Sequence, residues 1–554
     1  MENLLILLGG GPARYAFFAV LAGAFLLWTA WDVRRARRSL FLLALGLAIL
    51  ACRWPLAARN VELGVDDSQA IAAAMRLSED PIPWKYADLT TVGPLNAMPL
   101  VVASWLGFPI NFLMSHFNAL LMVWLAVAGA YLVLAERGDE RVARCGVLPA
   151  AAFFALTIFF DFAYSSSEHV PLALLGLGSA LLWQGAWRGV AWRVLTGTLL
   201  LGATPWAKLQ SVPLALWFCV AGAAVIAWRW RDERPRLVRL LGAWLAGGVA
   251  VSACFGVMLL LWGLVNQWYV AYIRQAVDYA DRGRFTYTQF WSDVLAFGGA
   301  EAGLGSFAGP LLVIGLMLAG AALFIARRRL PILALALGAA AVASYIIAAP
   351  GRQFYHYLLF GIIPLAMLVT ALLDATLERA GACRPPWFRN AVLGGFLALT
   401  LVPQIVARTR HDSKAIPYQR GNVALHRSDA ARYLNEAARP GDTMAVWGWV
   451  PRLHVESGLP PATRDGTTER QIIDHSLRQF YRQRYLFDLR RTRPRFFVEA
   501  ISPGFFAFTN RATLGIQTWP ELQAYVDTHY ELAAEIDGFR IFRAREVPPD
   551  RGTE

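Results

Sequence analysis

Long apolar runs separated by short charged segments make up the first 407 residues of the chain. A helix needs about 20 apolar residues to cross the roughly 30 Å hydrocarbon core of a bilayer. Runs of about this length predict twelve membrane-spanning helices, with boundaries soft by several residues, and the run at 194–228 can alternatively form one hairpin of short helices. The expected spans lie near residues 15–31, 39–55, 110–134, 145–161, 170–187, 194–207, 211–228, 240–264, 308–326, 331–349, 357–375 and 390–407.

The pattern changes after residue 407, where polar residues interrupt shorter apolar runs. Strand-like runs at 443–450, 495–501 and 538–543 alternate with helical patterns. Ser428 is placed to cap a helix over 429–438, and Trp519-Pro520-Glu521 opens a second helix that continues over 522–529. The sequence therefore predicts a small α/β domain at 408–554 after a membrane domain at 1–407.

The composition supports a membrane protein. Hydrophobic residues make up 57% of the 554 residues and charged residues only 16%, whereas soluble chains contain about 45–50% apolar and about 25% charged residues. This excess excludes a disordered chain, a small disulfide-rich protein and an ordinary cytosolic enzyme. Of the 52 basic residues, 49 are arginines that cluster between apolar runs, so the net charge of +13 does not indicate nucleic-acid binding.

The arginine clusters predict the orientation of the chain. They contribute 20 arginines to one face of the membrane domain, against eight on the opposite face, and basic residues mark the cytoplasmic side. We therefore expect both termini outside the cytoplasm and, for a bacterial inner membrane, a periplasmic C-terminal domain. The clusters lie at 34–38, 137–144, 188–193, 229–239, 327–329 and 379–389.

The first external loop, residues 56–109, is too long to be a simple connector. It contains Asp66 and Asp67 at the start of an amphipathic run, 70–77. Adjacent carboxylates at a membrane surface can act as a general base, because crowding and partial desolvation raise one pKa. Either aspartate can instead cap the helix that follows, and both roles can coexist. The apolar stretch 97–108 is too short to span, so we expect a helix lying at the outer surface.

Other ionisable residues lie at the external ends of predicted spans, where they are costly unless paired or functional. Asp161 and Glu168 follow the fourth span, and a solvated loop tip is the alternative for both. Lys208 lies between two apolar helices. A compact ammonium group there suits a phosphate, although a lysine that extends to the interface explains it as well.

A short external turn at 350–357 contains Arg352, Tyr355 and His356. Arginine, histidine and tyrosine at this point can hold a lipid-linked phosphate. An interfacial aromatic belt accounts for the tyrosines, but not for Arg352 together with His356.

Taken together, these features resemble the GT-C superfamily of membrane glycosyltransferases. The closer likeness is to the bacterial branch that contains the aminoarabinose, protein O-mannosyl and rhizobial lipopolysaccharide sugar transferases. It rests on the acidic pair of the first loop, the lysine after a short helix, the turn at 350–357 and the segments 446–451 and 457–464. The resemblance implies a GT-C-like polytopic α-helical fold of about 12 spans with a small C-terminal α/β extracytoplasmic domain.

In this family an acidic residue of the first loop activates the acceptor hydroxyl, and a polyprenyl-phosphate sugar is the donor. The resemblance implies that Asp66 is the base and Asp67 supports it. The pair Asp-Asp replaces the usual Asp-Glu, which leaves the choice between them open. The family's Lys-Pro-Pro element appears as Val92-Gly93-Pro94, so no donor-binding lysine transfers to that point. The expected donor-phosphate ligands are Lys208, Arg352, His356 and Tyr355, and the expected acceptor or second acidic site contains Asp161, Glu168 and Lys85.

The resemblance thus implies an inverting glycosyltransferase that moves a sugar to lipid A, a polysaccharide or a protein at the periplasmic face of the inner membrane. No separate cofactor is required, and a divalent cation on the acidic residues is left open. The expected partners are the lipid-linked donor, the glycan, lipid or protein acceptor and the bilayer, with no nucleic acid. The rival interpretations are a transporter or flippase for a lipid-linked sugar and a non-catalytic subunit that binds envelope glycans.

Overall fold

The computed structural model describes residues 12–157, 159–298, 304–322, 329–381, 385–410 and 424–545. The chain forms two compact units. The helical unit contains Met1–Arg59, His116–Trp262 and Tyr279–Val423, and the mixed unit contains Asn60–Ser115, Gly263–Asp278 and Ala424–Glu554. Of the residues used above, Arg327, Arg328 and Arg384 lie outside the described part. The same is true of residue 158 and residues 323–326 in two expected spans, and of residues 411–423 and 546–554 in the expected C-terminal domain.

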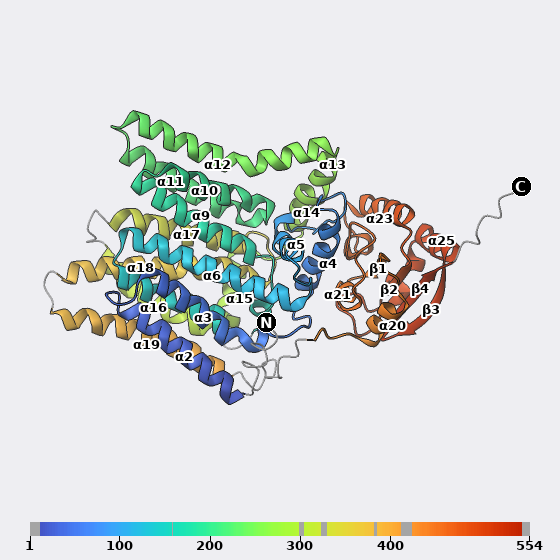
Figure 1. Cartoon of the computed structure of the whole chain (residues 1–554), viewed down its shortest axis with the longest axis horizontal. Helices are drawn as coiled ribbons and strands as arrows, with labels where there is room; N and C mark the ends of the chain where they lie inside the picture. Colours follow the sequence, from blue (N-terminus) through green and yellow to red (C-terminus); the bar gives the residue numbers. More distant parts are fainter. Residues whose placement is uncertain are drawn as a thin grey trace, which may run out of the picture. The chain divides into compact units, whose positions relative to one another are not determined.

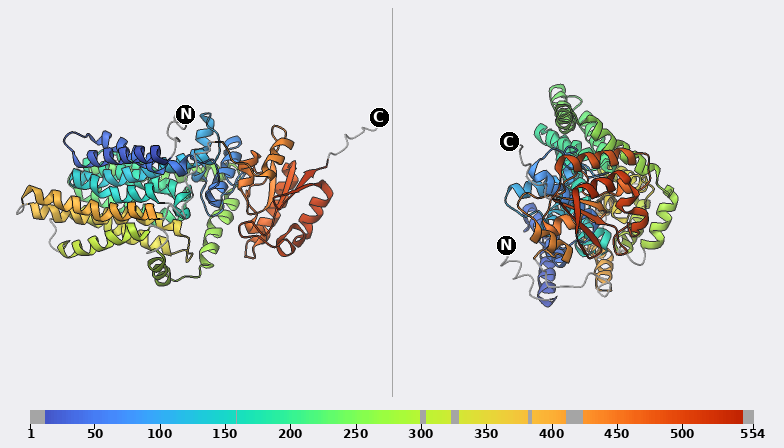
Figure 2. Two further views of the ribbon diagram at one scale, coloured as in Figure 1. Left: turned by 90° about the horizontal axis from the view of Figure 1, so that it is seen from below. Right: turned by 90° about the vertical axis from the view of Figure 1, so that its right-hand side faces the viewer.

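Each expected span corresponds to one long helix, and these helices lie side by side (Figures 1 and 2). Within the described residues, eight helices are long and apolar enough to cross a membrane. The polytopic helical membrane fold is therefore confirmed. The long helices are α2 Pro12–Trp31, α3 Arg38–Ala57, α6 Phe112–Arg137, α7 Glu140–Leu156, α9 His169–Arg188, α10 Ala191–Ala203, α11 Val212–Arg229, α12 Arg234–Leu261, α16 Leu304–Ala322, α17 Leu330–Ala348, α18 Leu359–Gly381 and α19 Pro386–Arg410.

Short elements connect several of these helices at positions that matter for the candidate site. The run 194–228 forms two helices, α10 and α11, joined by two single 3-10 turns. The short elements are α8 Phe160–Ala163, η2 Thr204–Trp206, η3 Leu209–Ser211, α15 Tyr287–Gly298 and η6 Tyr355–Leu358.

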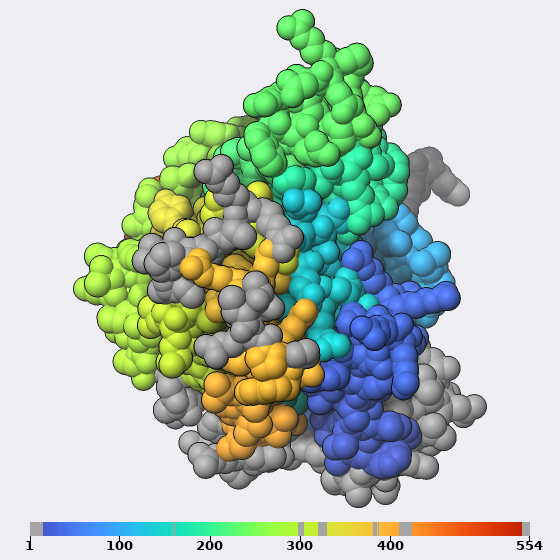
Figure 3. All heavy atoms as spheres, turned by 90° about the vertical axis from the view of Figure 1, so that its left-hand side faces the viewer, coloured from blue at the N-terminus to red at the C-terminus, as the bar shows by residue number. Residues whose placement is uncertain are grey.

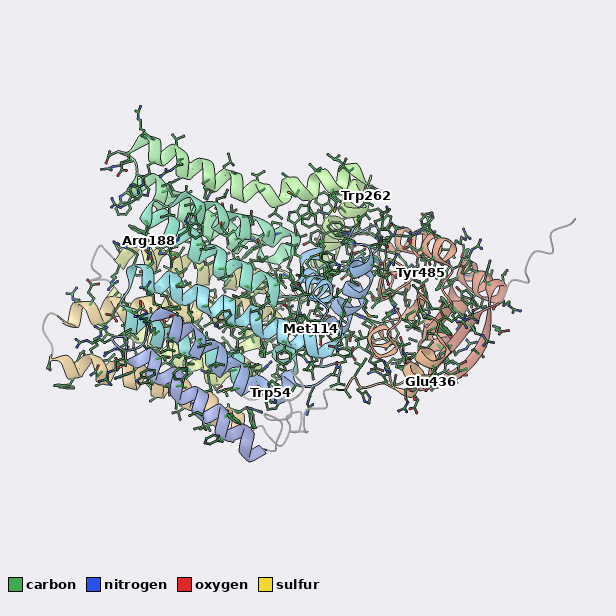
Figure 4. All side chains as sticks on the ribbon, viewed as in Figure 1. Trp54, Met114, Arg188, Trp262, Glu436 and Tyr485 are labelled. Carbon is green, nitrogen blue, oxygen red and sulfur yellow. The ribbon has the colours of Figure 1, made fainter. Side chains whose placement is uncertain are left out.

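The arginines of these clusters that the structure describes gather at one end of the helical unit, as the sequence predicts. Arg188 and Trp54 mark its two opposite ends in Figure 4. Ion pairs connect the loops at the Arg188 end, and Figure 3 shows blue, cyan and orange segments meeting on this face. The pairs are Arg38–Glu140, Arg188–Glu136, Arg329–Asp374 and Arg389–Asp139.

Glycines fix the position of α9, whose first turn lies beside the candidate site. A Cβ atom on Gly129 of α6 would lie 2.2 Å from the backbone of Gly176 in α9. A Cβ atom on Gly197 of α10 would lie 2.4 Å from the backbone nitrogen of Leu182 in α9. Because only glycine allows helix backbones to approach this closely, α9 is held between α6 and α10.

The mixed unit combines a four-stranded sheet with short helices, and its strand order is β1-β2-β4-β3. Strands β1 Met444–Gly448 and β2 Phe496–Ala500 are parallel, whereas β3 Tyr530–Ile536 and β4 Phe539–Ala544 join them in antiparallel pairs. The helical elements are α4 Val65–Glu79, η1 Pro94–Asn96, α5 Met98–Trp105, α13 Val265–Trp268, the π-helix η4 Tyr269–Arg274, α20 Asp429–Ala437, α21 Arg452–Ser457, α22 Glu469–Ile472, α23 Arg478–Thr492, α24 Arg511–Leu514, η8 Ile516–Thr518 and α25 Pro520–His529. Helix α14 Gln275–Asp281 begins in this unit and ends in the helical unit.

Helices cover both faces of this sheet (Figure 2), so β1 and β2 are buried along their whole length. Alternate residues point to opposite faces. Val446 and Phe496 pack with α20, and Trp447 and Phe497 pack with α23 and α25. The α/β domain is confirmed, together with three of its strands, the Ser428 cap of α20 and helix α25. The sequence does not predict strand β3, because its residues, which are exposed or half-buried except for Tyr530, form no long apolar run.

The compact units differ from the linear division at residue 407. The first external loop belongs to the mixed unit, where Ile71, Leu77 and Val101 share a buried core with Val455 of α21. Hydrophobic burial joins segments that lie almost 400 residues apart, which a division along the sequence cannot capture. The stretch 97–108 contains the short helix α5 with several exposed apolar side chains. Its expected position at a membrane surface stays a prediction.

Candidate functional site

Lys208 forms the centre of a buried polar cluster in the helical unit. It lies between η2 and η3, and only 7% of its surface is exposed. Its ammonium group contacts the carboxylate of Glu168, donates a hydrogen bond of 2.7 Å to the Ser167 hydroxyl and lies 4.9 Å from the ring centre of Tyr357. The alternative of a lysine that extends to the interface is therefore wrong, because the side chain is held inside the protein.

Glu168 is the anionic partner of Lys208 and is completely buried just before α9. Burial alone would raise the pKa of its carboxyl, but the charges of Lys208 and His356 hold the pKa below its usual range. The solvated loop tip proposed as an alternative for Glu168 is wrong. Asp161 is also buried, in α8, so a loop tip does not describe it either.

His356 joins the two carboxylates. Its Nδ1 lies 3.0 Å from the hydroxyl of Tyr164 and 3.9 Å from a carboxylate oxygen of Asp161. Its Nε2 lies 4.0 Å from a carboxylate oxygen of Glu168. Together with Lys208, these four residues form what we call the Lys208 cluster: Asp161, Tyr164, Glu168, Lys208 and His356. The cluster brings together four of the predicted site residues from three separate parts of the sequence.

Two tyrosines, Tyr279 and Tyr357, connect Arg352 to this cluster. Its guanidinium group donates a hydrogen bond of 3.3 Å to the carbonyl of Tyr279 and lies 4.7 Å from the Tyr279 ring centre. The Tyr279 hydroxyl is 3.1 Å from the hydroxyl of Tyr357, and the Tyr357 ring lies next to the ammonium group of Lys208. The Nε atom of Arg352 is buried without a hydrogen-bond partner among the described residues. Tyr355 packs edge-to-face against Phe159 at 5.8 Å.

The acidic pair lies on α4 in the mixed unit. Gly64 occupies the N-cap position without a side-chain cap, so neither aspartate is the N-cap residue, and both lie in the first turn. Asp67 is fully buried and accepts a hydrogen bond of 2.5 Å from the Ser115 hydroxyl, whereas Asp66 is half-buried. A carboxylate in the first turn is also stabilised by the helix dipole.

Glu62 is a third carboxylate of this region that the sequence did not single out. It accepts a hydrogen bond from the Ser68 hydroxyl and lies 3.5 Å from Arg452. Burial raises the pKa of Glu62, and the nearby charge of Asp67 adds to the rise. The crowding expected for the acidic pair thus includes a residue four positions before it.

Lys85 lies in a turn of the mixed unit. Its ammonium group is 5.1 Å from the ring centre of Tyr86, and the side chain is half-buried. The structure therefore distributes the expected site residues over both units: Asp161, Glu168, Lys208, Arg352, Tyr355 and His356 belong to the helical unit, and Asp66, Asp67 and Lys85 belong to the mixed unit.

Known proteins match this chain in fold and not in sequence. No family model matches it, and no curated protein matches it. The crystal structure of ArnT from Cupriavidus metallidurans bound to undecaprenyl phosphate is similar over 93% of this chain and 99% of its own, with 14% identity and a TM-score of 0.53. The apo state of the same protein is similar over 90% and 97%, with 14% identity and a TM-score of 0.52. The chain has the GT-C fold. The oligosaccharyltransferase of Archaeoglobus fulgidus has a lower TM-score of 0.45, with 12% identity over 84% of this chain and 70% of its own.

The helical unit also contains a cavity that the sequence did not indicate. It encloses about 20 Å³, which is room for about one water molecule, and its polar lining comes from Arg53, His116, Tyr164, Ser165 and His169. Arg53 is buried in α3 and donates to the carbonyls of Thr157 and Phe162, which flank the start of α8. A lone arginine in an apolar run, on the face opposite the arginine clusters, was the signal that could have identified it.

A metal ion in a protein is held by several ligating side chains. Among the described residues there is no group of three or more histidine, cysteine, aspartate or glutamate side chains that could hold one. A divalent cation on the acidic residues thus stays an untested expectation.

Proposed function

We propose that the protein is an inverting glycosyltransferase that transfers a sugar from a polyprenyl-phosphate donor to an acceptor of the bacterial envelope. The proposal places the reaction at the periplasmic face of the inner membrane, with the C-terminal domain on that side. The observation that carries it is the Lys208 cluster, which lies in loops opposite the arginine-rich end of the helical unit. The GT-C fold adds support, since ArnT from Cupriavidus metallidurans was crystallised with undecaprenyl phosphate.

The reaction requires two kinds of side chain, a base and cations. A sugar phosphate is already activated, so the acceptor hydroxyl needs a base and the departing lipid phosphate needs cations. In the proposed step, a carboxylate takes the hydroxyl proton while the acceptor oxygen forms a bond to the anomeric carbon. The bond from that carbon to the phosphate oxygen breaks, and its electron pair stays on the polyprenyl phosphate. Direct displacement inverts the anomeric centre.

We assign the base to Asp66. Its carboxylate is half-buried, whereas Asp67 is fully buried and bound by Ser115. A buried, hydrogen-bonded aspartate suits a supporting role, because its position is fixed and its access to an acceptor is limited. This favours the division of roles that the resemblance implies for Asp66 and Asp67.

Lys208, Arg352 and His356 are the proposed cations for the departing phosphate, with Tyr355 at the edge of the same turn. Arg352 has a buried Nε without a hydrogen-bond partner among the described residues, which is a group that an anionic ligand could satisfy. Glu168 fixes Lys208 in one position and balances its charge before a substrate arrives. Asp161 and Lys85 remain proposed parts of the acceptor or second acidic site.

The test uses the purified protein in lipid nanodiscs, lipid-linked sugars extracted from host membranes, and envelope material as acceptor. We expect the wild type to release polyprenyl phosphate and to form a glycosylated product. Replacing both aspartates, Asp66→Asn and Asp67→Asn, should abolish product formation. Asp80→Asn is the matched control, since Asp80 lies at the other end of α4 and pairs with Arg76.

Sugar transfer that persists in the double variant would refute the catalytic assignment. Movement of the intact lipid-linked sugar across a vesicle membrane, without cleavage of the bond to phosphate, would instead favour the transporter. Binding of envelope glycans without transfer or movement would favour the non-catalytic subunit.

A further inference from the structure

The turn that contains Lys85 has a strained backbone. Trp84 and Thr90 both have positive φ angles, 59° and 67°. Such angles cost residues other than glycine of the order of 1 kcal/mol or more, so they persist only where the surroundings impose them. We call residues 82–90 the Lys85 turn. Inside it, the Trp84 amide donates to the Ala87 carbonyl at 2.8 Å, which holds the turn closed.

Asp88 connects the Lys85 turn to the rest of the mixed unit through charged groups. Its carboxylate lies 3.4 Å from a guanidinium nitrogen of Arg470 and 2.6 Å from one of Arg484. The same carboxylate accepts a hydrogen bond of 2.9 Å from the Thr90 amide, and the Asp88 amide donates to the carbonyl of Arg464 at 2.8 Å. Thus one side chain connects the strained Thr90 to the C-terminal part of the chain.

These groups belong to a closed buried cluster. Arg470 and Arg484 also donate to Asp465, at 3.0 and 2.5 Å, and both cations lie over the ring of Tyr481, at 4.2 and 4.9 Å. All of them are buried, so two carboxylates balance two guanidinium groups away from water. Removing the charge of Asp88 leaves one buried cation without compensation, and the unit must then relax at this point.

The Lys85 turn is further held by an aromatic contact. The ring of Trp84 lies 5.9 Å from the ring of Tyr272 in η4, and Trp84 is buried although its backbone is strained. Lys85 and Tyr86 lie between the buried Trp84 and Ala87 and are themselves half-buried. A strained segment that is held on both sides and presents a lysine is typical of a binding site, where strain keeps a group in position.

We infer that Asp88 is a positioning residue, through which Arg470 and Arg484 of the C-terminal domain hold the Lys85 turn in its strained conformation and present Lys85 to substrate. This inference rests on the proposed function for its last step. It gives the C-terminal domain a definite role: the domain completes the first external loop and does not act only as a separate binding module.

Glu499 provides a matched control in the same unit. It is a fully buried carboxylate that lies 3.1 Å from a guanidinium nitrogen of Arg540 and 3.5 Å from one of Arg511. It connects β2 to β4 and to the start of α24, and the Lys85 turn takes no part in these contacts. Asp88→Asn and Glu499→Gln therefore make the same chemical change at two buried carboxylates that each pair with two arginines. The arginines around Glu499 are partly exposed, and only the Asp88 cluster includes the turn.

The first measurement follows the turn without any substrate. The chain has three lysines, Lys85, Lys208 and Lys414, so acetylation of each can be followed by mass spectrometry on the full-length protein. We expect Asp88→Asn to raise the acetylation rate of Lys85 at least about threefold, because the released turn exposes its ammonium group. The rate at the buried Lys208 should stay unchanged, and Glu499→Gln should alter neither lysine.

The second measurement is a double-mutant cycle on sugar transfer from host lipid-linked sugars to envelope material. If Asp88 acts through Lys85, Asp88→Asn and Lys85→Met each raise the KM by about tenfold, and the double variant is no worse than either one. If Asp88→Asn does not fold, the same comparison is made with Thr90→Gly added, since glycine accepts the positive φ without strain.

The outcomes separate the two proposals. An unchanged acetylation rate at Lys85 overturns the inference, whatever the activity. Multiplied effects of Asp88→Asn and Lys85→Met overturn it too, because a merely structural role acts independently of Lys85. Released acetylation in a protein that never transfers sugar would leave the holding role of Asp88 intact and would refute the proposed function.

Discussion

Replacing Lys208 by methionine tests whether the Lys208 cluster depends on a buried ion pair. Methionine keeps most of the volume of the side chain and removes the ammonium group that neutralises the fully buried Glu168. Removing one partner of a buried pair costs about 3–5 kcal/mol, because the remaining charge is left without compensation. The lower end applies because His356, 4.0 Å from Glu168, still places a cationic side chain near the carboxylate.

A second variant separates charge from packing. In Lys208→Met combined with Glu168→Gln, no unpaired charge remains, and replacing both members of a buried pair by neutral groups of similar volume is often close to neutral. We therefore expect the double variant to recover most of the stability that the single variant loses. Arg38→Met is the control, since Arg38 pairs with Glu140 at an exposed position and an exposed pair contributes at most about 1 kcal/mol.

The assay is thermal unfolding of the purified variants in one detergent, with sugar transfer measured in parallel. The single variant should unfold at a clearly lower temperature than the wild type and the double variant close to it, while both lose donor use. A double variant as unstable as the single one would refute the argument, because the loss would then come from packing. Full sugar transfer by the double variant would remove Lys208 from the donor site.

Three further predictions concern other buried groups. Charges of neighbouring arginines hold the pKa of Asp88 below its usual range, against the effect of burial. The ionised Asp88 therefore stabilises the fold fully above the unfolded-state pKa of about 3.9. This stabilisation is lost as the pH falls towards the lower folded-state pKa. In acid titrations, the stability difference between the wild type and Asp88→Asn should therefore narrow below about pH 4, and a gap independent of pH would contradict this. Burial raises the pKa of Glu62, so the folded state binds the Glu62 proton more tightly than the unfolded state and loses stability as the pH rises. Glu62→Gln should therefore be at least as stable as the wild type at pH 8. A clear loss of stability in this variant at pH 8 would contradict the raised pKa. Arg53→Ala should reduce sugar transfer about tenfold, and added methylguanidinium should restore sugar transfer by entering the cavity. Leu56→Ala, which enlarges the same cavity, is the control. An equal gain of sugar transfer with methylguanidinium in Leu56→Ala would show that the rescue is not specific to Arg53.

The sequence predicts the membrane fold well because its signals are local. An apolar run long enough to span forms a helix without long-range information, and the arginine clusters occupy the loops that Arg188–Glu136 and similar ion pairs connect. The Ser428 cap and helix α25 follow from capping residues next to them. Such elements depend on residues within one or two turns, and the sequence shows these directly.

The remaining features depend on distant residues. Glu168 and Lys208 belong to different loops, so the sequence gives no sign that they form a buried ion pair. The mixed unit joins the first external loop to the C-terminal domain through Val455 and through Arg470 and Arg484, and neither contact leaves a pattern along the chain. Ionisable residues at the ends of predicted spans identified part of the candidate site. The side chains that these residues contact could be identified only from the structure.

The central claim is that this protein attaches a sugar to an envelope molecule by means of the acidic pair on α4. Mass spectrometry of envelope glycans tests it most directly, in a host strain that lacks the gene and carries either the wild type or the Asp66→Asn, Asp67→Asn variant. The account predicts that one glycosyl mass increment disappears with the gene, returns with the wild type and does not return with an equally abundant variant. An unchanged set of glycans in the deletion strain, or full restoration by the variant, would contradict it.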